Sequence, residues 1–141
     1  MSFFDFPIYT PAQDLLGKNF TPIISGPIAI FVYDGDYGES EQALLSKIIG
    51  ATGNQLNDIE VSQLNAQDIL PIKQTWNDQK GIDIIFGVNK AQLMLQSEVH
   101  PYYPLRIDER TLLFCDALTE LSQNAEKKKA LWGCLKTYFE I

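Results

Sequence analysis

The sequence predicts an α/β fold, with three α/β/α layers built around a central, mainly parallel sheet of four strands. Two observations predict it. Short, nearly all-apolar runs rich in β-branched residues alternate with helix-spaced segments along residues 28–141, as expected for strands covered on both faces. The chain of 141 residues has the usual size of one domain. Such alternation favours parallel strands joined by right-handed crossovers, with helices on both faces of the sheet.

The first strand is expected at residues 28–33, where an apolar run ends in the turn residues of DGDYG. A helix follows, with Ser40 as its expected N-cap and Gly50 and Gly53 at its end. Its inner side carries the apolar residues Leu44, Leu45, Ile48 and Ile49.

The rest of the chain continues the alternation of strand and helix. The expected elements are a second strand around Ile59 and Val61, a crossover at 65–76 interrupted by Pro71, a third strand at 81–88, a short helix at 89–97, a fourth strand at 111–118 and a terminal helix. Large apolar residues at helical spacing indicate that the terminal helix packs on the core, with Trp132 buried.

Residues 1–27 are interpreted as an aromatic arm, separate from the single α/β domain of residues 28–141. Four prolines interrupt any long helix in this arm, yet the segment is strongly apolar. Its main aromatic anchors are Phe3, Phe4, Phe6 and Tyr9. Because exposed aromatic patches lower solubility, the arm must pack on its own domain or dock on a partner.

Composition limits the possible partners. The formal net charge is -7, so the chain as a whole is repelled by nucleic acid and by anionic lipid, and no direct DNA binding is expected. The basic cluster of residues 127–129 with Lys136 is interpreted as a solvated helix face. No run approaches the about 18 apolar residues of a membrane helix, and no export signal is evident. We therefore expect a cytoplasmic protein without membrane contact.

The loop DGDYGES, residues 34–40, follows the first strand, where an open α/β sheet usually places its site. Its acidic residues would repel a phosphate. As a calcium loop it begins D-x-D, but Gly38, Glu39 and Leu45 stand where a ligand, the turn glycine and the bidentate glutamate belong. A capped, solvated turn is the better interpretation, and no metal or cofactor is expected.

No complete catalytic set is evident, so we expect a protein that is not an enzyme. His100 is the single histidine, and no nucleophile elbow accompanies it. Cys115 and Cys134 lie within apolar patterns that keep a thiol protonated. One catalytic hypothesis remains, in which Asp34 or Asp36 activates water while His100 stabilises a developing anion.

The stretch DALTELSQNAEKKKALWGCLKTY, residues 116–138, resembles the C-terminal region of the psi-subunit family of bacterial DNA polymerase III. Agreement that includes a tryptophan and several polar positions exceeds what helix periodicity alone demands. The matching residues are Ala117, Leu118, Thr119, Glu120, Leu121, Asn124, Ala130, Leu131, Trp132, Thr137 and Tyr138. GPIAIFV and SQLNAQDILP are weaker echoes of the same family.

The resemblance implies a uracil-DNA glycosylase-like fold that is catalytically inactive. IIFGVNKAQLML is similar to a glycosylase strand, turn and helix, but DGDYGES lacks the water-activating pattern, and residues 115–117 occupy the place of the catalytic histidine. In the arm, LLGKNF is similar to the segment with which psi docks on the clamp loader. This similarity implies that Leu15, Leu16 and Phe20 bind that partner.

The resulting expectation is a non-catalytic adaptor of the polymerase III holoenzyme. It would link the clamp loader to a chi-like subunit and, indirectly, to the single-strand DNA-binding protein. One alternative is a glycosylase-like DNA-base enzyme, in which Tyr37, Tyr102 and Tyr103 stack on a flipped base. Another is an α/β binding protein of unknown role, in which Trp132 is core and nothing more.

Overall fold

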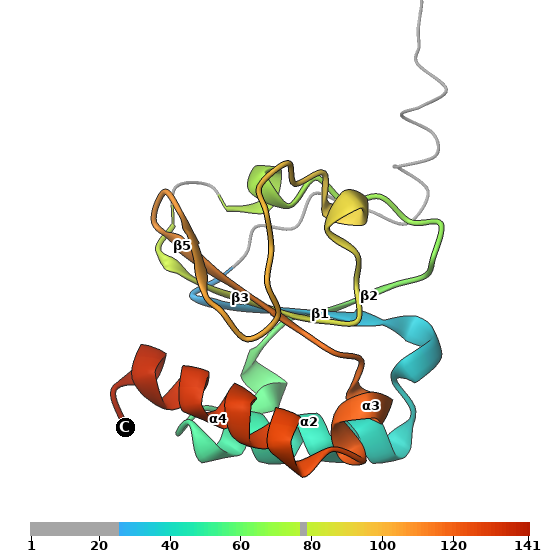
Figure 1. Cartoon of the computed structure of the whole chain (residues 1–141), viewed down its shortest axis with the longest axis vertical. Helices are drawn as coiled ribbons and strands as arrows, with labels where there is room; N and C mark the ends of the chain where they lie inside the picture. The colour runs from blue at the N-terminus through green and yellow to red at the C-terminus, as the bar shows by residue number, and fades with distance from the viewer. Residues whose placement is uncertain (1–25, 77–78) are drawn as a thin grey trace, which may run out of the picture.

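The computed structural model describes residues 26–76 and 79–141, and it is a mixed α/β structure (Figure 1). The predicted α/β class is therefore confirmed. The arm anchors Phe3, Phe4, Phe6 and Tyr9, and the clamp-loader residues Leu15, Leu16 and Phe20, lie outside the described residues.

The central sheet has five strands, so the expected number of four is wrong. The strands are β1 (Ile28–Tyr33), β2 (Val61–Leu64), β3 (Gly81–Phe86), β4 (Leu105–Ile107) and β5 (Arg110–Cys115), in the spatial order β2-β1-β3-β5-β4. The first four in this order are parallel, and β4 runs antiparallel to β5. Only a tight turn, with Asp108 in the left-handed conformation, separates β4 from β5. Three residues are too few to show a strand pattern, which is why the sequence did not reveal β4.

Three α-helices pack on one face of the sheet in the described residues: α2 (Glu39–Ala51), α3 (Leu118–Ser122) and α4 (Ala125–Phe139). The expected cap of α2 at Ser40 is wrong. Gly38 is the N-cap, and its backbone N–H donates to Glu41 Oε1 at 2.8 Å. Asn124 separates α3 from α4 and caps α4, since its side-chain oxygen accepts from Lys127 N at 3.0 Å.

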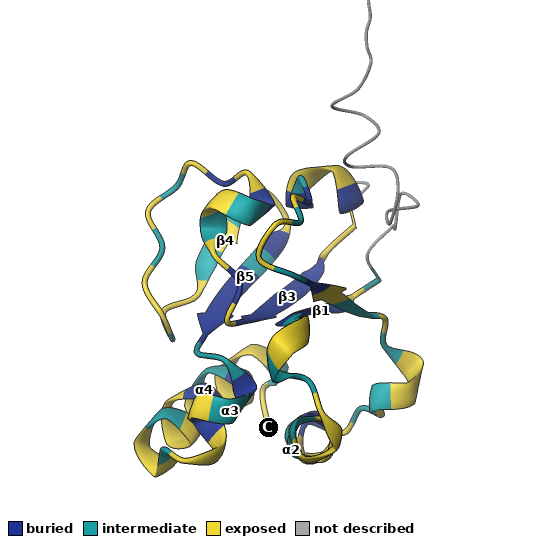
Figure 2. Cartoon of the chain, turned by 90° about the vertical axis from the view of Figure 1, so that its right-hand side faces the viewer, coloured by how far each residue is buried: buried dark blue, intermediate teal, exposed yellow. Residues whose placement is uncertain are grey.

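The helices cover a core formed by alternate residues of the sheet. Figure 2 shows that the central strands are buried between this helical layer and the loops on the other face. Its fully buried sheet residues include Ile30, Ile84 and Phe86, against Leu45 and Leu135 from the helices. Within the described residues, no helix is both long and apolar enough to cross a bilayer.

The opposite face carries a second core, covered by 3-10 turns and loops rather than by an α-helix in the described residues. The covering turns are η4 (Ile72–Thr75) and η5 (Lys90–Leu93). The helix expected at 89–97 is therefore only one turn long. It ends where Met94 adopts a left-handed conformation with φ 56°. Pro71 similarly restricts the crossover before η4.

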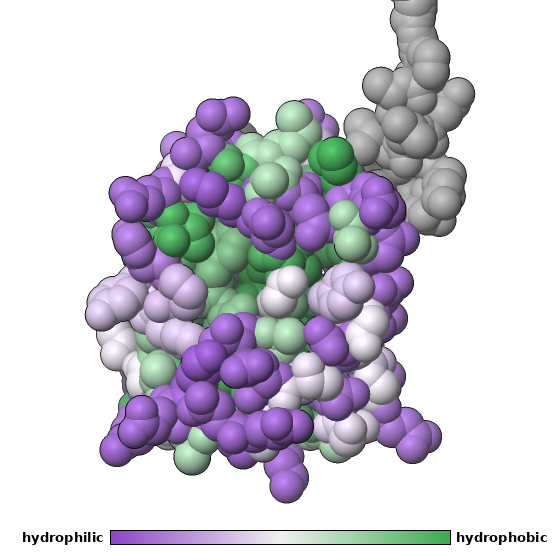
Figure 3. All heavy atoms as spheres, turned by 45° about the vertical axis from the view of Figure 1, so that its right-hand side comes forward, coloured by the Kyte–Doolittle hydropathy of each residue, from purple (hydrophilic) through white to green (hydrophobic). Residues whose placement is uncertain are grey.

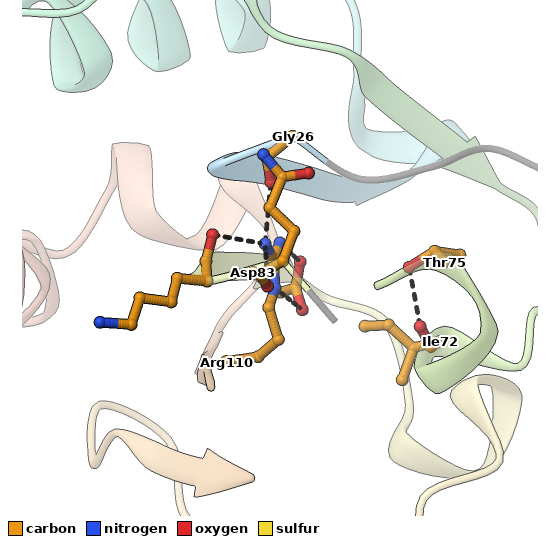
Figure 4. A network of polar contacts seen from close by, with 7 residues as sticks. Gly26, Ile72, Thr75, Asp83 and Arg110 are labelled. Atoms are coloured by element: carbon orange, nitrogen blue, oxygen red, sulfur yellow. Dashed lines mark hydrogen bonds and ion pairs between the residues drawn. The ribbon is translucent and has the colours of Figure 1, made fainter. Parts of the chain in front are cut away.

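A buried ion pair joins Asp83 of β3 to Arg110, the first residue of β5 (Figure 4). Arg110 Nη2 donates to Asp83 Oδ1 at 2.6 Å, and the two side chains are 1% and 0% exposed. Arg110 Nη1 also donates to the carbonyls of Gly26, Gln79 and Lys80. One guanidinium therefore ties the entry to β1, the start of β3 and the start of β5 together.

Gly81 is the cross-strand partner of Arg110, and the pairing requires a glycine there. A β-carbon at Gly81 would collide with the guanidinium of Arg110 and with the carbonyl oxygen of Pro27. The close packing of these backbones positions the guanidinium over Asp83.

Replacing Arg110 with methionine is expected to leave Asp83 buried without its cation. The Arg110→Met variant should lose about 3–5 kcal/mol of unfolding free energy, measured by urea denaturation. The double variant Asp83→Leu with Arg110→Met should lose less, because no unpaired charge remains buried. A single variant that is at least as stable as the double variant would contradict this account.

Candidate partner-binding site

The carboxyl edge of the parallel strands holds the residues of the catalytic hypothesis. Asp36 lies in the turn after β1 and accepts a hydrogen bond from Thr119 Oγ1 of α3 at 3.0 Å. His100 is exposed, with its Nε2 3.5 Å from Glu98 Oε2 and its ring edge-on to Tyr103. In the described residues, no hydrogen bond or ion pair joins His100 to Asp34 or Asp36. The structure therefore does not connect the proposed acid and imidazole.

Tyr102 belongs to a network of polar contacts at the carboxyl edge of the sheet. Its hydroxyl donates to Asp116 Oδ2 at 2.8 Å, and Lys127 Nζ lies 3.2 Å from the same oxygen. Lys127 also contacts Glu120 at 3.4 Å. Burial, together with the neighbouring Asp116 carboxylate, raises the pKa of Tyr102. These groups are bonded to one another and fix the loop before β4 against α4.

The three tyrosines named for base stacking do not have equivalent environments. Tyr102 is held by Asp116, and Tyr37 packs partly against the core beneath the helices. Tyr103 is 72% exposed.

The side of the molecule drawn in Figure 3 is mainly hydrophilic, with apolar residues visible in a central hollow.

Neither cysteine is set up as a nucleophile. Burial raises the pKa of the Cys115 thiol well above its usual value, and the neighbouring Cys134 and Asp116 add to the rise. Burial also raises the pKa of Cys134, whose Sγ donates to the Tyr102 carbonyl at 3.1 Å. Both thiols are therefore protonated at neutral pH. Among residues 26–76 and 79–141, no group of three or more His, Cys, Asp or Glu side chains is placed to hold a metal ion.

An apolar groove lies between α2 and α4 on the outer side of the helical layer. It has a volume of about 200 Å³ and is lined by Lys47, Ile48, Ala51, Lys128, Leu131 and Trp132. The short helix α3 packs against both α2 and α4, which contact each other less closely. The groove lies between the two longer helices, and we refer to it as the α2–α4 groove.

Both walls of the α2–α4 groove carry the same kinds of residue. In α4, Lys128, Leu131 and Trp132 share one face at helical spacing, and Lys47 and Ile48 stand opposite in α2. Leu131 is buried, whereas Trp132 is only half-buried, so the expectation that Trp132 is a core residue is only partly met. Its remaining surface faces the groove.

The lysines of the predicted basic cluster have different roles. Lys127 is paired with Asp116 and Glu120, which makes it part of the network at the sheet edge. Lys128 lines the groove with Lys47, and neither makes an ion pair with a carboxylate in the described part of the chain. The interpretation of a uniform solvated face is therefore too simple.

A larger cavity, of about 530 Å³, lies near the amino ends of β1 and β2. Ile28 and Phe31 contribute apolar surface to it, and Asp58 and Glu60 stand among its polar residues. Gly26, the first described residue, forms part of its wall.

Alkylation of the native protein is expected to distinguish the two thiols. With iodoacetamide at mildly alkaline pH, Cys134 should react first, and Cys115 should react more than about tenfold more slowly, because its raised pKa leaves less thiolate and burial blocks access. Mass spectrometry of the peptides would follow each site, with urea-unfolded protein as the control in which both react. Rapid labelling of native Cys115 would contradict the buried, protonated thiol.

Comparisons with protein-family models, with curated proteins and with solved structures found no match to this chain. The structural feature that remains as a basis for function is the α2–α4 groove, whose α4 wall includes Leu131 and Trp132.

Proposed function

We propose that the protein is a non-catalytic adaptor that binds other proteins through two separate elements. The observation that carries the proposal is the α2–α4 groove, in which apolar side chains from two helices are bordered by lysines that have no carboxylate partner among the described residues. A groove of this kind can hold an apolar side chain of a partner protein as an anchor. Tryptophan is also the residue most enriched among the energetic centres of such sites.

The aromatic arm of residues 1–27 is the second proposed binding element. Arg110 donates a hydrogen bond to the carbonyl of Gly26, which fixes the first described residue of the domain. An apolar leader joined to a fixed point of a rigid domain suits a protein that connects two partners. Leu15, Leu16 and Phe20 are the residues that we assign to the second partner, from their similarity to the psi docking segment.

The specific form of the proposal is a psi-type subunit of the replicative polymerase III holoenzyme. In this role the arm would bind the clamp loader, and the domain would bind a chi-like subunit that reaches single-strand DNA-binding protein. The net charge of -7 supports contact with DNA through other subunits rather than directly. A uracil-DNA glycosylase-like arrangement is part of this proposal, and the four parallel strands β2, β1, β3 and β5 are compatible with it.

The groups at the carboxyl edge support binding over catalysis. Tyr102, Asp116 and Lys127 are already bonded to one another, and Asp36 is bonded to Thr119. A general base must lie within hydrogen-bond distance of the substrate proton that it removes. The hydrogen bonds and ion pairs of these groups give them a structural role instead.

Substitutions in the arm of the full chain test the proposed function. The double variant Leu15→Ser with Phe20→Ser should bind the purified clamp loader of the same organism at least about tenfold more weakly, because apolar anchors at such sites contribute about 2 kcal/mol or more. The control is Asp14→Ser with Asn19→Ser, which changes polar neighbours in the same segment. Isothermal titration calorimetry would give both dissociation constants.

Two results would count against the adaptor. One is a wild-type chain that does not bind the clamp loader at any accessible concentration. The other is excision of uracil from a single-stranded oligonucleotide that is lost in His100→Ala, which would favour the glycosylase-like enzyme.

A further inference from the structure

We propose that the α2–α4 groove binds a short acidic segment of a partner protein, with one large apolar side chain of that segment as its anchor. This inference rests on the proposed adaptor function and adds the chemistry of the partner. Three properties of the groove lead to it: its size, its lining and its charge.

The size of the groove fits a side-chain anchor. Pockets that enclose small molecules usually have volumes of about 300–1,000 Å³. The α2–α4 groove, at about 200 Å³, is smaller and lies open between two helices. It can therefore take one or two side chains of a peptide that lies across the surface.

The lining determines the type of anchor. Ile48 and Ala51 of α2 face Leu131 and Trp132 of α4, so the floor and walls are apolar. An apolar anchor would remove this surface from water, whereas a polar group placed there would lose its hydrogen bonds with water. A leucine or an aromatic side chain is the anchor that this lining selects.

The charge determines the rest of the segment. Lys47 on one wall and Lys128 on the other are both exposed, and neither has a carboxylate partner among the described residues. Lys129, the next residue of α4, is likewise exposed and unpaired there. On a chain with net charge -7, this is a local positive border around an apolar groove. Carboxylates on both sides of the anchor would pair with these lysines.

Lys127 provides an internal comparison. It belongs to the same turn of α4, but Asp116 and Glu120 already satisfy its charge within the domain. Corresponding intramolecular partners are missing from the described surroundings of Lys47 and Lys128. Carboxylates supplied by another protein are the complementary groups.

The experiment uses the full-length protein and three fluorescein-labelled peptides, with binding followed by fluorescence anisotropy. The test peptide alternates aspartate with leucine and phenylalanine. In the second peptide lysine replaces every aspartate, and in the third serine replaces every leucine and phenylalanine. We expect the test peptide to bind at least tenfold more tightly than either control, and its affinity to fall as salt concentration rises.

Matched variants locate the binding in the groove. Lys47→Glu and Lys128→Glu should each weaken binding of the test peptide about fivefold or more. Lys136→Glu is the control, because Lys136 is exposed on the same helix but does not line the groove. Trp132→Ala should weaken binding at least tenfold, and Trp132→Phe should retain most of it. Thermal unfolding of each variant would confirm that the domain is folded.

Several results would overturn the inference. These are no binding of the test peptide, equal binding of all three peptides, or equal losses for Lys128→Glu and Lys136→Glu. Displacement of the test peptide by single-stranded DNA as effectively as by unlabelled peptide would also overturn it, because it would show a general anion site. If peptide binding fails while the arm still binds the clamp loader, only this inference is wrong. Failure of clamp-loader binding with peptide binding intact would contradict the replisome role alone.

Discussion

The buried ion pair between Arg110 and Asp83 is the constraint on which the arrangement of the domain depends. A buried charge is stable only where its counter-charge lies within bonding distance. The pair therefore fixes the register between β3 and β5. The same guanidinium binds the carbonyl of Gly26, which fixes the entry to β1. With its central strands in place, the sheet presents an apolar surface to the helices on one side and to the turns on the other.

The two faces of the sheet are covered differently in the described residues. On one face, α2, α3 and α4 pack on the strands, and the α2–α4 groove lies between the two longer helices. On the other face, short turns lie directly on the strands. Tyr102, Asp116 and Lys127 bond to one another at the carboxyl edge of the sheet. The proposed binding groove is therefore separate from the edge where α/β enzymes usually keep their catalytic groups.

Much of the sheet could be predicted because parallel strands are buried on both faces and appear as nearly continuous apolar runs. The runs at 28–33, 81–88 and 111–118 contain all of β1, all of β3 and all of β5 except its first residue, Arg110. β4 and the early end of η5 depend on backbone conformations at Asp108 and Met94, which are not reserved for a particular residue type. The sequence does carry a signal for the ion pair, because Asp83 interrupts an otherwise apolar strand and a charge in that position requires a cation nearby. The groove could not be foreseen, because Lys47 and Lys128 are brought together only by the fold.

The anchoring of Gly26 also determines how the domain responds to mechanical force. β1 lies between β2 and β3, with parallel backbone pairing on both sides. Tension applied along β1 from its amino end would load those hydrogen bonds simultaneously, in shear, instead of breaking them one after another. The hydrogen bond from Arg110 to the Gly26 carbonyl adds resistance at the point where the force would be applied. A force applied at the amino end of β1 would therefore have to break the pairing of β1 with both of its neighbours to release the strand.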